Sequence, residues 1–434
     1  MARTEDAPAR SERRRGAARA AGSSATTPDH AVNARPIDLR IPGGAIRGQV
    51  APGFERVAEA FRENFLRLGE VGAALCVVLR GQPVVDLWGG VADQAAGRAW
   101  DRDTPAPLFS TGKGAIAIAC AVAVSRGHFA YDDRVAQHWP GFAAHGKGDI
   151  TIRQILDHSA GLPRFGRAVG PETLDDAERM SEVIEAMVPA WEPGTAWGYH
   201  LATFGPLLSQ IITRTDPRRR HFADFFDEEI ARPLGLDLQF GLSFRRRPEL
   251  ARLSWPGALQ LADALTHAPF GFQWQVLNPL SSLRRAFREI RLPLDERAWL
   301  AHDMPSGNAL GTARSVARLY DCLLQGGGAL SLRPDVVCAL SAPPQPPRDG
   351  IRDQVVNVDN LWHLGFIRPS EDFAFRPSLS AFGMPGLGGS FGFCDKASGI
   401  AYAYVPNRVG LLPFDDRRER RLRAALDACL QGEG

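Results

Sequence analysis

The first clear hydrophobic pattern lies in residues 54–68, where large apolar side chains recur every three or four positions and so predict a helix. These side chains are Phe54, Val57, Phe61, Phe65 and Leu68. Two apolar runs follow at 72–79 and 83–91, separated by the short polar turn that begins at Arg80. Runs of this length around a turn are typical of an antiparallel strand pair.

Residues 115–124 are all apolar or small, which predicts a helix buried on every side. Gly127 follows the run and suits the end of a helix. Ser110 precedes this helix and Lys113 comes one turn later. Because residues three apart share a helix face, the Ser110 hydroxyl and the Lys113 amine are expected to meet.

Further helical patterns occupy the middle of the chain, at 151–157, 174–187, 201–214, 222–231 and 311–324. Residues 242–300 show little clear period, and we expect helix and loop there. Near the end, residues 389–393 and 400–406 predict a second antiparallel strand pair, and residues 415–429 predict an amphipathic helix.

Strand patterns therefore lie near both ends of the chain, with mostly helices between them. We expect an α+β fold in which both chain ends build one sheet, at about 46–135 and 355–434. A mainly helical region is inserted at about 136–354. Residues 1 to about 40 have almost no large apolar side chains, so we expect a disordered tail over 1–45 and one domain over 46–434.

Composition and charge narrow the class of protein. The formal net charge of +2 predicts neither a nucleic-acid nor a membrane partner. No segment reaches the roughly 18 uninterrupted apolar residues of a membrane span, and no secretory signal is recognised. The six cysteines are scattered and the ten histidines show no metal-ligand spacing, so we expect a cytoplasmic protein without a metal or other cofactor. The oligomeric state stays open.

Ser110 and Lys113 are the strongest candidates for chemistry. A serine hydroxyl becomes a nucleophile when a base takes its proton, and a lysine serves only if burial lowers its pKa from about 10.4. Of the 51 Lys and Arg residues only Lys113, Lys147 and Lys396 are lysines. Arginine cannot act as a base, so a lysine in this apolar run favours a catalytic role. The alternative is structural, with Ser110 as a helix cap and Lys113 reaching the surface.

Three other segments accompany this pair in chain order. They are Leu156-Asp157-His158-Ser159-Ala160-Gly161-Leu162-Pro163, then Trp191-Glu192-Pro193-Gly194-Thr195-Ala196-Trp197-Gly198-Tyr199-His200, and Gly386-Leu387-Gly388-Gly389-Ser390. With Ser110-x-x-Lys113 they resemble the serine hydrolases of the class C β-lactamase superfamily, above all family VIII carboxylesterases and β-lactamase-related hydrolases. The resemblance covers about 54–408 and implies the β-lactamase/transpeptidase-like fold, an antiparallel sheet with helices on both faces.

The resemblance also implies a role for each site residue. Ser110 would be acylated, Lys113 would activate it, and Tyr199 would pass the proton to the leaving group. The backbone N–H groups of Ser110 and Leu387 would form the oxyanion hole. Asn308 lies in a segment that resembles one bordering the family's pocket, and is a candidate for substrate contact.

Two positions depart from the family's pattern. The tyrosine motif reads Tyr199-His200-Leu201. We place His200 among the substrate-binding residues, where it either tunes Tyr199 or is an exposed neighbour. The third motif usually begins with Lys or His, whereas here it reads Met384-Pro385-Gly386, and we place Met384 and Gly386 among the substrate-binding residues. Methionine carries no charge. Unless a nearby arginine restores the charge, we expect a neutral ester or thioester in place of a penicillin or a peptidoglycan stem.

Ser390 lies in a Gly-x-Ser-x-Gly sequence, the pattern of the α/β-hydrolase nucleophile. That nucleophile needs a strand, a sharp turn and then a helix. Strand-like residues follow Ser390, and the last histidine of the chain is His363, so no later histidine can complete the usual order. We therefore do not expect Ser390 to be the nucleophile.

The expected function is that of a serine hydrolase cleaving a carboxylic ester through an acyl-enzyme on Ser110, with a small-molecule ester or acyl substrate as its partner. Two alternatives stay open. One is acyl transfer, in which an alcohol or amine replaces water. The other is a binding module without turnover, which only the loss of charge at Met384 favours.

Overall fold

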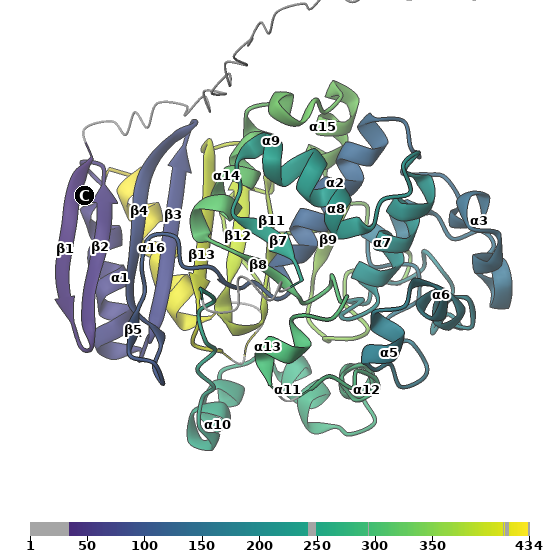
Figure 1. The fold of residues 1–434 in the computed structure, drawn as a ribbon, viewed down its shortest axis with the longest axis horizontal. Coiled ribbons are helices and arrows are strands. Elements are labelled where there is room, and N and C mark those ends of the chain that lie inside the picture. Colours follow the sequence, from purple (N-terminus) through teal and green to yellow (C-terminus); the bar gives the residue numbers. More distant parts are fainter. Residues whose placement is uncertain (1–33, 242–248, 294, 411, 413–415, 433–434) are drawn as a thin grey trace, which may run out of the picture. The chain divides into compact units, whose positions relative to one another are not determined.

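The computed structural model describes residues 34–432 apart from 242–248, 294, 411 and 413–415. Within this part, ten strands form one antiparallel sheet in the order β1-β2-β4-β3-β13-β12-β11-β10-β9, with β5 paired to β4 (Figure 1). The strands are β1 (Arg35–Ile41), β2 (Gly44–Val50), β3 (Gly72–Leu79), β4 (Gln82–Asp93), β5 (Arg98–Ala99), β9 (Leu361–His363), β10 (Phe366–Arg368), β11 (Ala381–Pro385), β12 (Phe391–Asp395) and β13 (Ile400–Pro406).

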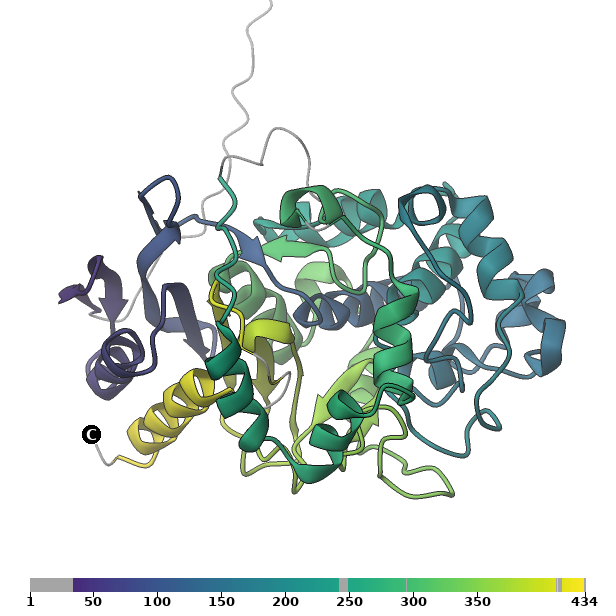
Figure 2. The same ribbon diagram turned by 90° about the horizontal axis from the view of Figure 1, so that it is seen from below.

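The sheet joins the two ends of the domain at its centre, where β3 pairs with β13. Alternate side chains of these strands enter two separate cores. Cys76 and Ala403 face a core built largely from α2 (Thr111–Ser125), α14 (Ala313–Leu324) and the helical region, whereas Leu75 and Tyr402 face α1 (Glu55–Arg67) and α16 (Arg417–Leu430). Helices α1 and α16 lie side by side on that second face (Figure 2). The expected sheet with helices on both faces is confirmed.

The helical region lies between β5 and β9 in the chain. Its helices are α3 (Val135–His138), α4 (Ile152–Leu156), α5 (Pro171–Leu174), α6 (Ala177–Glu185), α7 (Phe204–Thr215), α8 (Phe222–Phe226), α9 (Arg232–Leu234), α10 (Ala258–Thr266), α11 (Phe270–Leu277), α12 (Ser282–Glu289), α13 (Glu296–Trp299) and α15 (Pro334–Ser341). Shorter helical turns occupy Pro140–Gly146, Asp227–Ala231, Gly328–Leu330 and Leu387–Gly389. In the described part of the chain, no helix is long and apolar enough to cross a membrane.

A second, small sheet fixes the start of α2. In the described residues it consists of β6 (Ala106–Pro107), β8 (Ala309–Gly311) and β7 (Leu238–Phe240), with β8 in the middle. Because β6 leads directly into α2, this sheet holds the entry of α2 against the segment before α14.

The expected tail over residues 1–45 is wrong for its last part. Residues 35–41 and 44–50 form the strands β1 and β2, and β2 pairs with β4. Ile37, Leu39 and Ile41 alternate with polar residues, which is the period of a strand whose one face packs on α1. The rest of the expected tail, residues 1–33, lies outside the described residues.

Candidate active site

Ser110 lies where the chain passes from β6 into α2. The preceding residue, Phe109, has a left-handed backbone with φ of 48°, which a residue other than glycine adopts only in special turns. Strand pairing fixes the turn, because the Leu108 N–H donates to the Ala309 carbonyl over 2.8 Å. Ser110 is partly exposed, so its hydroxyl is accessible while its backbone is held.

Lys113 follows one helical turn later and is completely buried. Its Nζ lies 2.9 Å from Ser110 Oγ and donates to the Ser306 carbonyl over 2.9 Å. Burial lowers the pKa of this amine to about 7, because a buried ammonium loses its hydration. A large fraction of Lys113 is therefore unprotonated near neutral pH, as a general base requires.

A second buried lysine shows a different arrangement. Lys147 donates to the carbonyls of Ala144, Glu185 and Met187 over 2.7, 2.8 and 2.6 Å. All three ammonium protons thus have a backbone acceptor, which suits a charged group that ties loops together. Lys113 differs in having a hydroxyl as a partner.

Tyr199 reaches Ser110 from the loop that precedes α7. Its side chain hydrogen-bonds with that of Ser110, and Lys113 Nζ lies 5.1 Å from the centre of its ring. Burial raises the pKa of the Tyr199 phenol well above its ordinary value, so the hydroxyl stays protonated at neutral pH. The structure thus brings together the three side chains to which the sequence assigned catalysis.

A buried carboxylate, missed by the sequence analysis, holds the Tyr199 loop. Asp353 accepts hydrogen bonds from the Tyr199 N–H over 3.1 Å and from the Trp362 indole over 3.0 Å. Its first oxygen also accepts from the N–H groups of Val355 and Val356. The Trp362 ring stacks on that of Tyr199, with ring centres 5.4 Å and planes 2° apart. Asp353 therefore fixes both the backbone of Tyr199 and the ring on which it rests.

His200 is fully buried, and the backbone uses both nitrogens of its ring. Nε2 accepts from the Leu162 N–H over 3.0 Å, so Nδ1 carries the proton and donates to the Gly198 carbonyl over 2.7 Å. The expectation that His200 contacts a substrate is therefore wrong, because neither nitrogen is free. His158 packs beside it, with Nδ1 accepting from the His200 N–H and its ring 5.2 Å from that of Tyr199. Both histidines support the tyrosine loop.

The segment after β11 lies against the turn that carries Ser110. A Cβ at Gly386 would come within 2.5 Å of the Leu108 carbonyl oxygen and 2.8 Å of Thr111 Oγ1, so a larger residue does not fit there. Among the described residues, the N–H groups of Ser110 and Leu387 have no hydrogen-bond acceptor. The two donors expected for an oxyanion hole thus lie unpaired on two segments in contact.

Met384 and Asn308 are both buried near this region. Met384 lies in β11 against Gly114 of α2, where an added Cβ would be 3.3 Å from the Met384 Cβ. It presents an apolar surface beside the residue that follows Lys113. Asn308 Nδ2 donates to the His302 carbonyl over 2.7 Å, and its Oδ1 has no partner among the described residues. Contact of either side chain with a substrate stays a prediction.

Ser390 stands behind the Ser110 turn and is followed by the strand β12, as expected from the sequence. Its Oγ donates to the Leu108 carbonyl over 2.8 Å and lies 3.0 Å from Thr111 Oγ1. The side chain is buried. Ser390 therefore braces the turn that presents Ser110.

No group of three or more His, Cys, Asp or Glu side chains in the described part of the chain is arranged to hold a metal ion.

The fold and the Ser110–Lys113 pair define a serine hydrolase of the Ser-x-x-Lys type. The Beta-lactamase family model matches residues 54–427, and this protein belongs to that family. The esterase/beta-lactamase LipL of Mycobacterium tuberculosis (strain ATCC 25618 / H37Rv) is 32% identical over 379 residues, which cover 85% of this chain and 84% of LipL.

Solved structures agree with this assignment. A family VIII carboxylesterase is similar with 33% identity and a TM-score of 0.75, covering 88% of this chain and 99% of that one. A penicillin-binding protein homologue from Caulobacter crescentus is similar with 34% identity and a TM-score of 0.76 over the same shares of the two chains.

Proposed function

We propose that this protein hydrolyses neutral carboxylic esters through an acyl-enzyme on Ser110. The observation that carries the proposal is the 2.9 Å contact between Lys113 Nζ and Ser110 Oγ, at an amine whose pKa burial lowers to about 7. Similarity to LipL and to a family VIII carboxylesterase supports the same reaction class.

In the acylation step, Ser110 Oγ attacks the ester carbonyl while its proton passes to Lys113 Nζ. The carbonyl oxygen becomes an oxyanion, which the N–H groups of Ser110 and Leu387 stabilise. The bond to the alcohol then breaks, and the leaving oxygen takes the proton of the Tyr199 hydroxyl. Lys113 returns its extra proton to Tyr199, so the phenol ends the step neutral, as its raised pKa favours.

Deacylation repeats these transfers with water. Water attacks the acyl carbonyl while a proton passes to Lys113 through the same hydroxyl network, and Ser110 Oγ leaves and recovers its proton. Acyl transfer differs only in that an alcohol or amine replaces water.

The preference for a neutral substrate rests on Met384. The side chain at this position is apolar and buried beside α2, so it supplies no positive charge for a substrate carboxylate. A carboxylate brought against this surface would lose hydration without gaining a partner.

The experiment combines intact-mass spectrometry after a fluorophosphonate probe with turnover of two p-nitrophenyl esters of similar length, the butyrate and the monoester of succinic acid. We expect one adduct on the wild type and a kcat/KM at least about tenfold higher for the butyrate, because the succinate carboxylate must be desolvated. Products are quantified with and without added alcohol to separate hydrolysis from acyl transfer.

Ser110→Ala is expected to lose the adduct and the turnover together, whereas Ser390→Ala serves as the matched serine control and keeps the adduct. An adduct that persists in Ser110→Ala, or faster turnover of the charged ester, contradicts the proposal.

A further inference from the structure

Helices α11 and α12 expose a cluster of large apolar side chains, which we call the α11–α12 surface. Its members, with their exposed fractions, are Phe270 (81%), Trp274 (57%), Leu277 (65%), Leu280 (67%) and Phe287 (48%). The other large apolar side chains that are exposed in the described part of the chain, such as Val188 and Leu379, lie in separate elements. Single exposed apolar residues are normal, but a cluster marks an interaction site.

The exposure follows from the helical period of α11. Phe270, Trp274 and Leu277 are spaced by four and three residues and therefore share one face, which points outward. Phe272 occupies the opposite face and is buried. The helix thus packs one face against the core and exposes a second apolar face to solvent.

Arginines border this apolar surface. Arg284, Phe287, Arg288 and Arg291 recur with helical spacing and are exposed, while Leu283 of α12 is buried. Arg284 and Arg291 take part in no ion pair among the described residues, and Arg288 donates only to the Pro279 carbonyl. Residues 270–291 contain four arginines and a single carboxylate.

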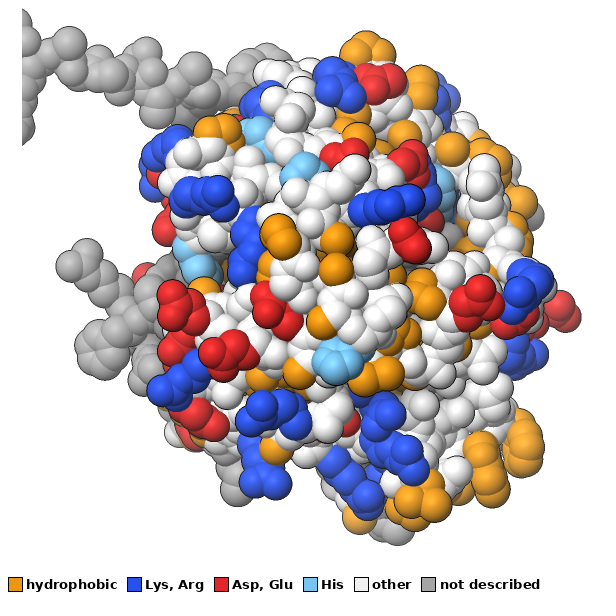
Figure 3. All heavy atoms as spheres, turned by 90° about the vertical axis from the view of Figure 1, so that its right-hand side faces the viewer, with side chains coloured by type: hydrophobic (Ala, Val, Ile, Leu, Met, Phe, Trp, Pro, Cys, Tyr) orange, Lys and Arg blue, Asp and Glu red, His pale blue; other side chains and the backbone are white. Residues whose placement is uncertain are grey.

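That carboxylate, Glu289, does not neutralise the surface. It accepts from the Gly166 N–H over 3.2 Å and pairs with Arg164 of another segment. Figure 3 shows one side of the molecule, with hydrophobic side chains beside Lys and Arg side chains along its lower edge. Figure 1 places α11 and α12 at the same lower level.

We propose that the α11–α12 surface docks this protein on an anionic lipid bilayer. Tryptophan, phenylalanine and leucine on one face enter the boundary between headgroups and acyl chains, while neighbouring arginines pair with lipid phosphates. The charges also decide against a second copy as the occupant, because a two-fold contact would bring the arginines of both copies together. The expectation of no membrane partner rested on the net charge of the whole chain, which does not report a local cluster.

The surface is coupled to the elements around the site. The Asn357 side chain donates to the Gly271 carbonyl over 3.5 Å, and Asn357 belongs to the turn in which Asp353 holds Tyr199. Trp299 of α13 stacks on Phe109, the residue before Ser110, with ring centres 5.8 Å apart. Docking would therefore place the turn that contains Asn357 near the lipid. The inference goes beyond ester hydrolysis and does not depend on it.

The test uses the full chain carrying Ser110→Ala, so that binding is measured without turnover. Sedimentation with vesicles of phosphatidylcholine alone is compared with vesicles that also contain phosphatidylglycerol. We expect binding to the anionic vesicles to be at least about tenfold tighter, and to weaken as salt rises from about 0.1 M to about 0.5 M because salt shortens the range over which the arginines and the lipid phosphates attract each other. Equal binding to both vesicles, or binding to neither, overturns the proposal.

Surface variants separate this interface from unspecific adsorption. Arg284→Gln with Arg288→Gln is expected to weaken binding to anionic vesicles about fivefold per arginine. Phe270→Gln with Trp274→Gln is expected to weaken it at least about tenfold. Val188→Gln with Leu379→Gln, which removes two exposed apolar side chains elsewhere, is the matched control and should bind as the parent does.

Thermal unfolding and sedimentation velocity accompany each variant. Unchanged unfolding temperatures are expected, because the replaced side chains are exposed. If the parent is a dimer that the Phe270→Gln with Trp274→Gln variant dissociates, this surface is a contact between copies and the proposal is wrong. Wild-type vesicle binding in both surface variants also overturns it.

Discussion

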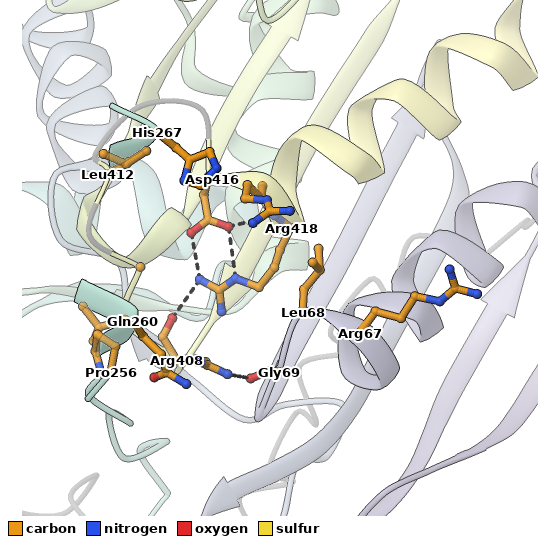
Figure 4. Close-up of a pocket in the computed structure, with 13 residues that line it drawn as sticks. Arg67, Leu68, Gly69, Pro256, Gln260, His267, Arg408, Leu412, Asp416 and Arg418 are labelled. Carbon is orange, nitrogen blue, oxygen red and sulfur yellow. Dashed lines mark hydrogen bonds and ion pairs between the residues drawn. The ribbon is translucent and has the colours of Figure 1, made fainter. Parts of the chain in front are cut away.

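The guanidinium of Arg418 donates a hydrogen bond to the Gly388 carbonyl over 2.9 Å, so the C-terminal helix α16 holds the loop that presents the Leu387 N–H. Arg418 is buried and also pairs with Glu70 over 2.9 Å and with Asp416 over 3.0 Å. Figure 4 shows this guanidinium beside the Asp416 carboxylate in the wall of a cavity of about 420 Å³. The expected oxyanion donor therefore depends on a buried ion-pair network outside the catalytic motifs.

Replacing Arg418 by methionine is expected to reduce both stability and turnover. The Glu70 carboxylate would stay buried without its cation, which lowers the free energy of unfolding by about 3–5 kcal/mol. The Gly388 loop would no longer hold the Leu387 N–H in place, so kcat is expected to fall by about tenfold. This loss is smaller than the one seen when an oxyanion donor is removed altogether. Urea unfolding and steady-state ester kinetics measure the two effects.

The matched control is Arg423→Met in the same helix, where Arg423 pairs with buried Glu419 over 2.7 Å. It is expected to lose stability without a comparable loss of kcat. Equal kcat losses in both variants would show that Arg418 acts on turnover through general stability.

Ester turnover is expected to follow the protonation of Lys113. Its pKa is lowered to about 7, so kcat/KM should rise with pH, reach half its plateau near pH 7, and fall about tenfold per pH unit below that. Stopped-assay profiles with a neutral ester measure this limb. Tyr199→Phe should lower kcat by about 100-fold or more while leaving the limb in place. If the residual activity of Lys113→Ala shows the same rise of kcat/KM with pH, a group other than Lys113 is responsible for that rise.

The same buried amine affects stability with a defined sign. Its folded pKa of about 7 lies below the unfolded value of 10.5, so the unfolded chain binds more protons between these pH values and unfolding free energy rises with pH across that window. Lys113→Met removes the cost of burying a charge. It is expected to stabilise the fold by about 4 kcal/mol at pH 6 and to have little effect near pH 11.

Lys147→Met provides the comparison for this prediction. It leaves the carbonyls of Ala144, Glu185 and Met187 without their donor, which should destabilise the fold. Because burial also lowers the pKa of Lys147, to about 8, this loss of stability should be smaller at pH 6 than near pH 11. A Lys113→Met protein that is less stable than the wild type at pH 6 would contradict a burial cost at Lys113.

Asp353 is expected to act as a positioning residue for Tyr199. Asp353→Asn keeps the shape but turns one oxygen into an NH₂ group that faces an N–H donor, which costs about 1–3 kcal/mol of stability. Tyr199 should shift, so kcat should fall several-fold with little change in KM. Trp362→Phe, which keeps an aromatic ring but loses the indole donor, should retain more activity. If Asp353→Asn is as active as the wild type, Asp353 does not position Tyr199 for catalysis.

The sequence predicted the parts of this site that depend on local spacing. Ser110 and Lys113 share a helix face because they are three residues apart, and the apolar run after them predicts burial. Tyr199 was placed by resemblance to a family. Asp353 was not predicted because it contacts the Tyr199 backbone from more than a hundred residues away along the chain. Arg418 was not predicted because it reaches the site through the backbone carbonyl of Gly388.

Two predictions were wrong, the disordered tail at residues 35–45 and the substrate contact of His200, and each error has a local cause. Ile37, Leu39 and Ile41 alternate with polar residues as a strand does, but the surrounding composition suggested a tail. His200 follows Tyr199 directly, and only the fold shows that its ring turns to the Leu162 and Gly198 backbone.

The pairing of β3 with β13 also bears on how a cell makes this enzyme. A ribosome that has translated up to residue 360 has released Ser110, Lys113 and Tyr199, yet β9 to β13 and the Gly386 loop are still unmade. Until they emerge, the inner edge of β3 has no partner and its apolar residues are available to chaperones. Sheet closure waits for a contact between residues more than three hundred positions apart, so it comes late in folding and turnover begins only after β13 has been made.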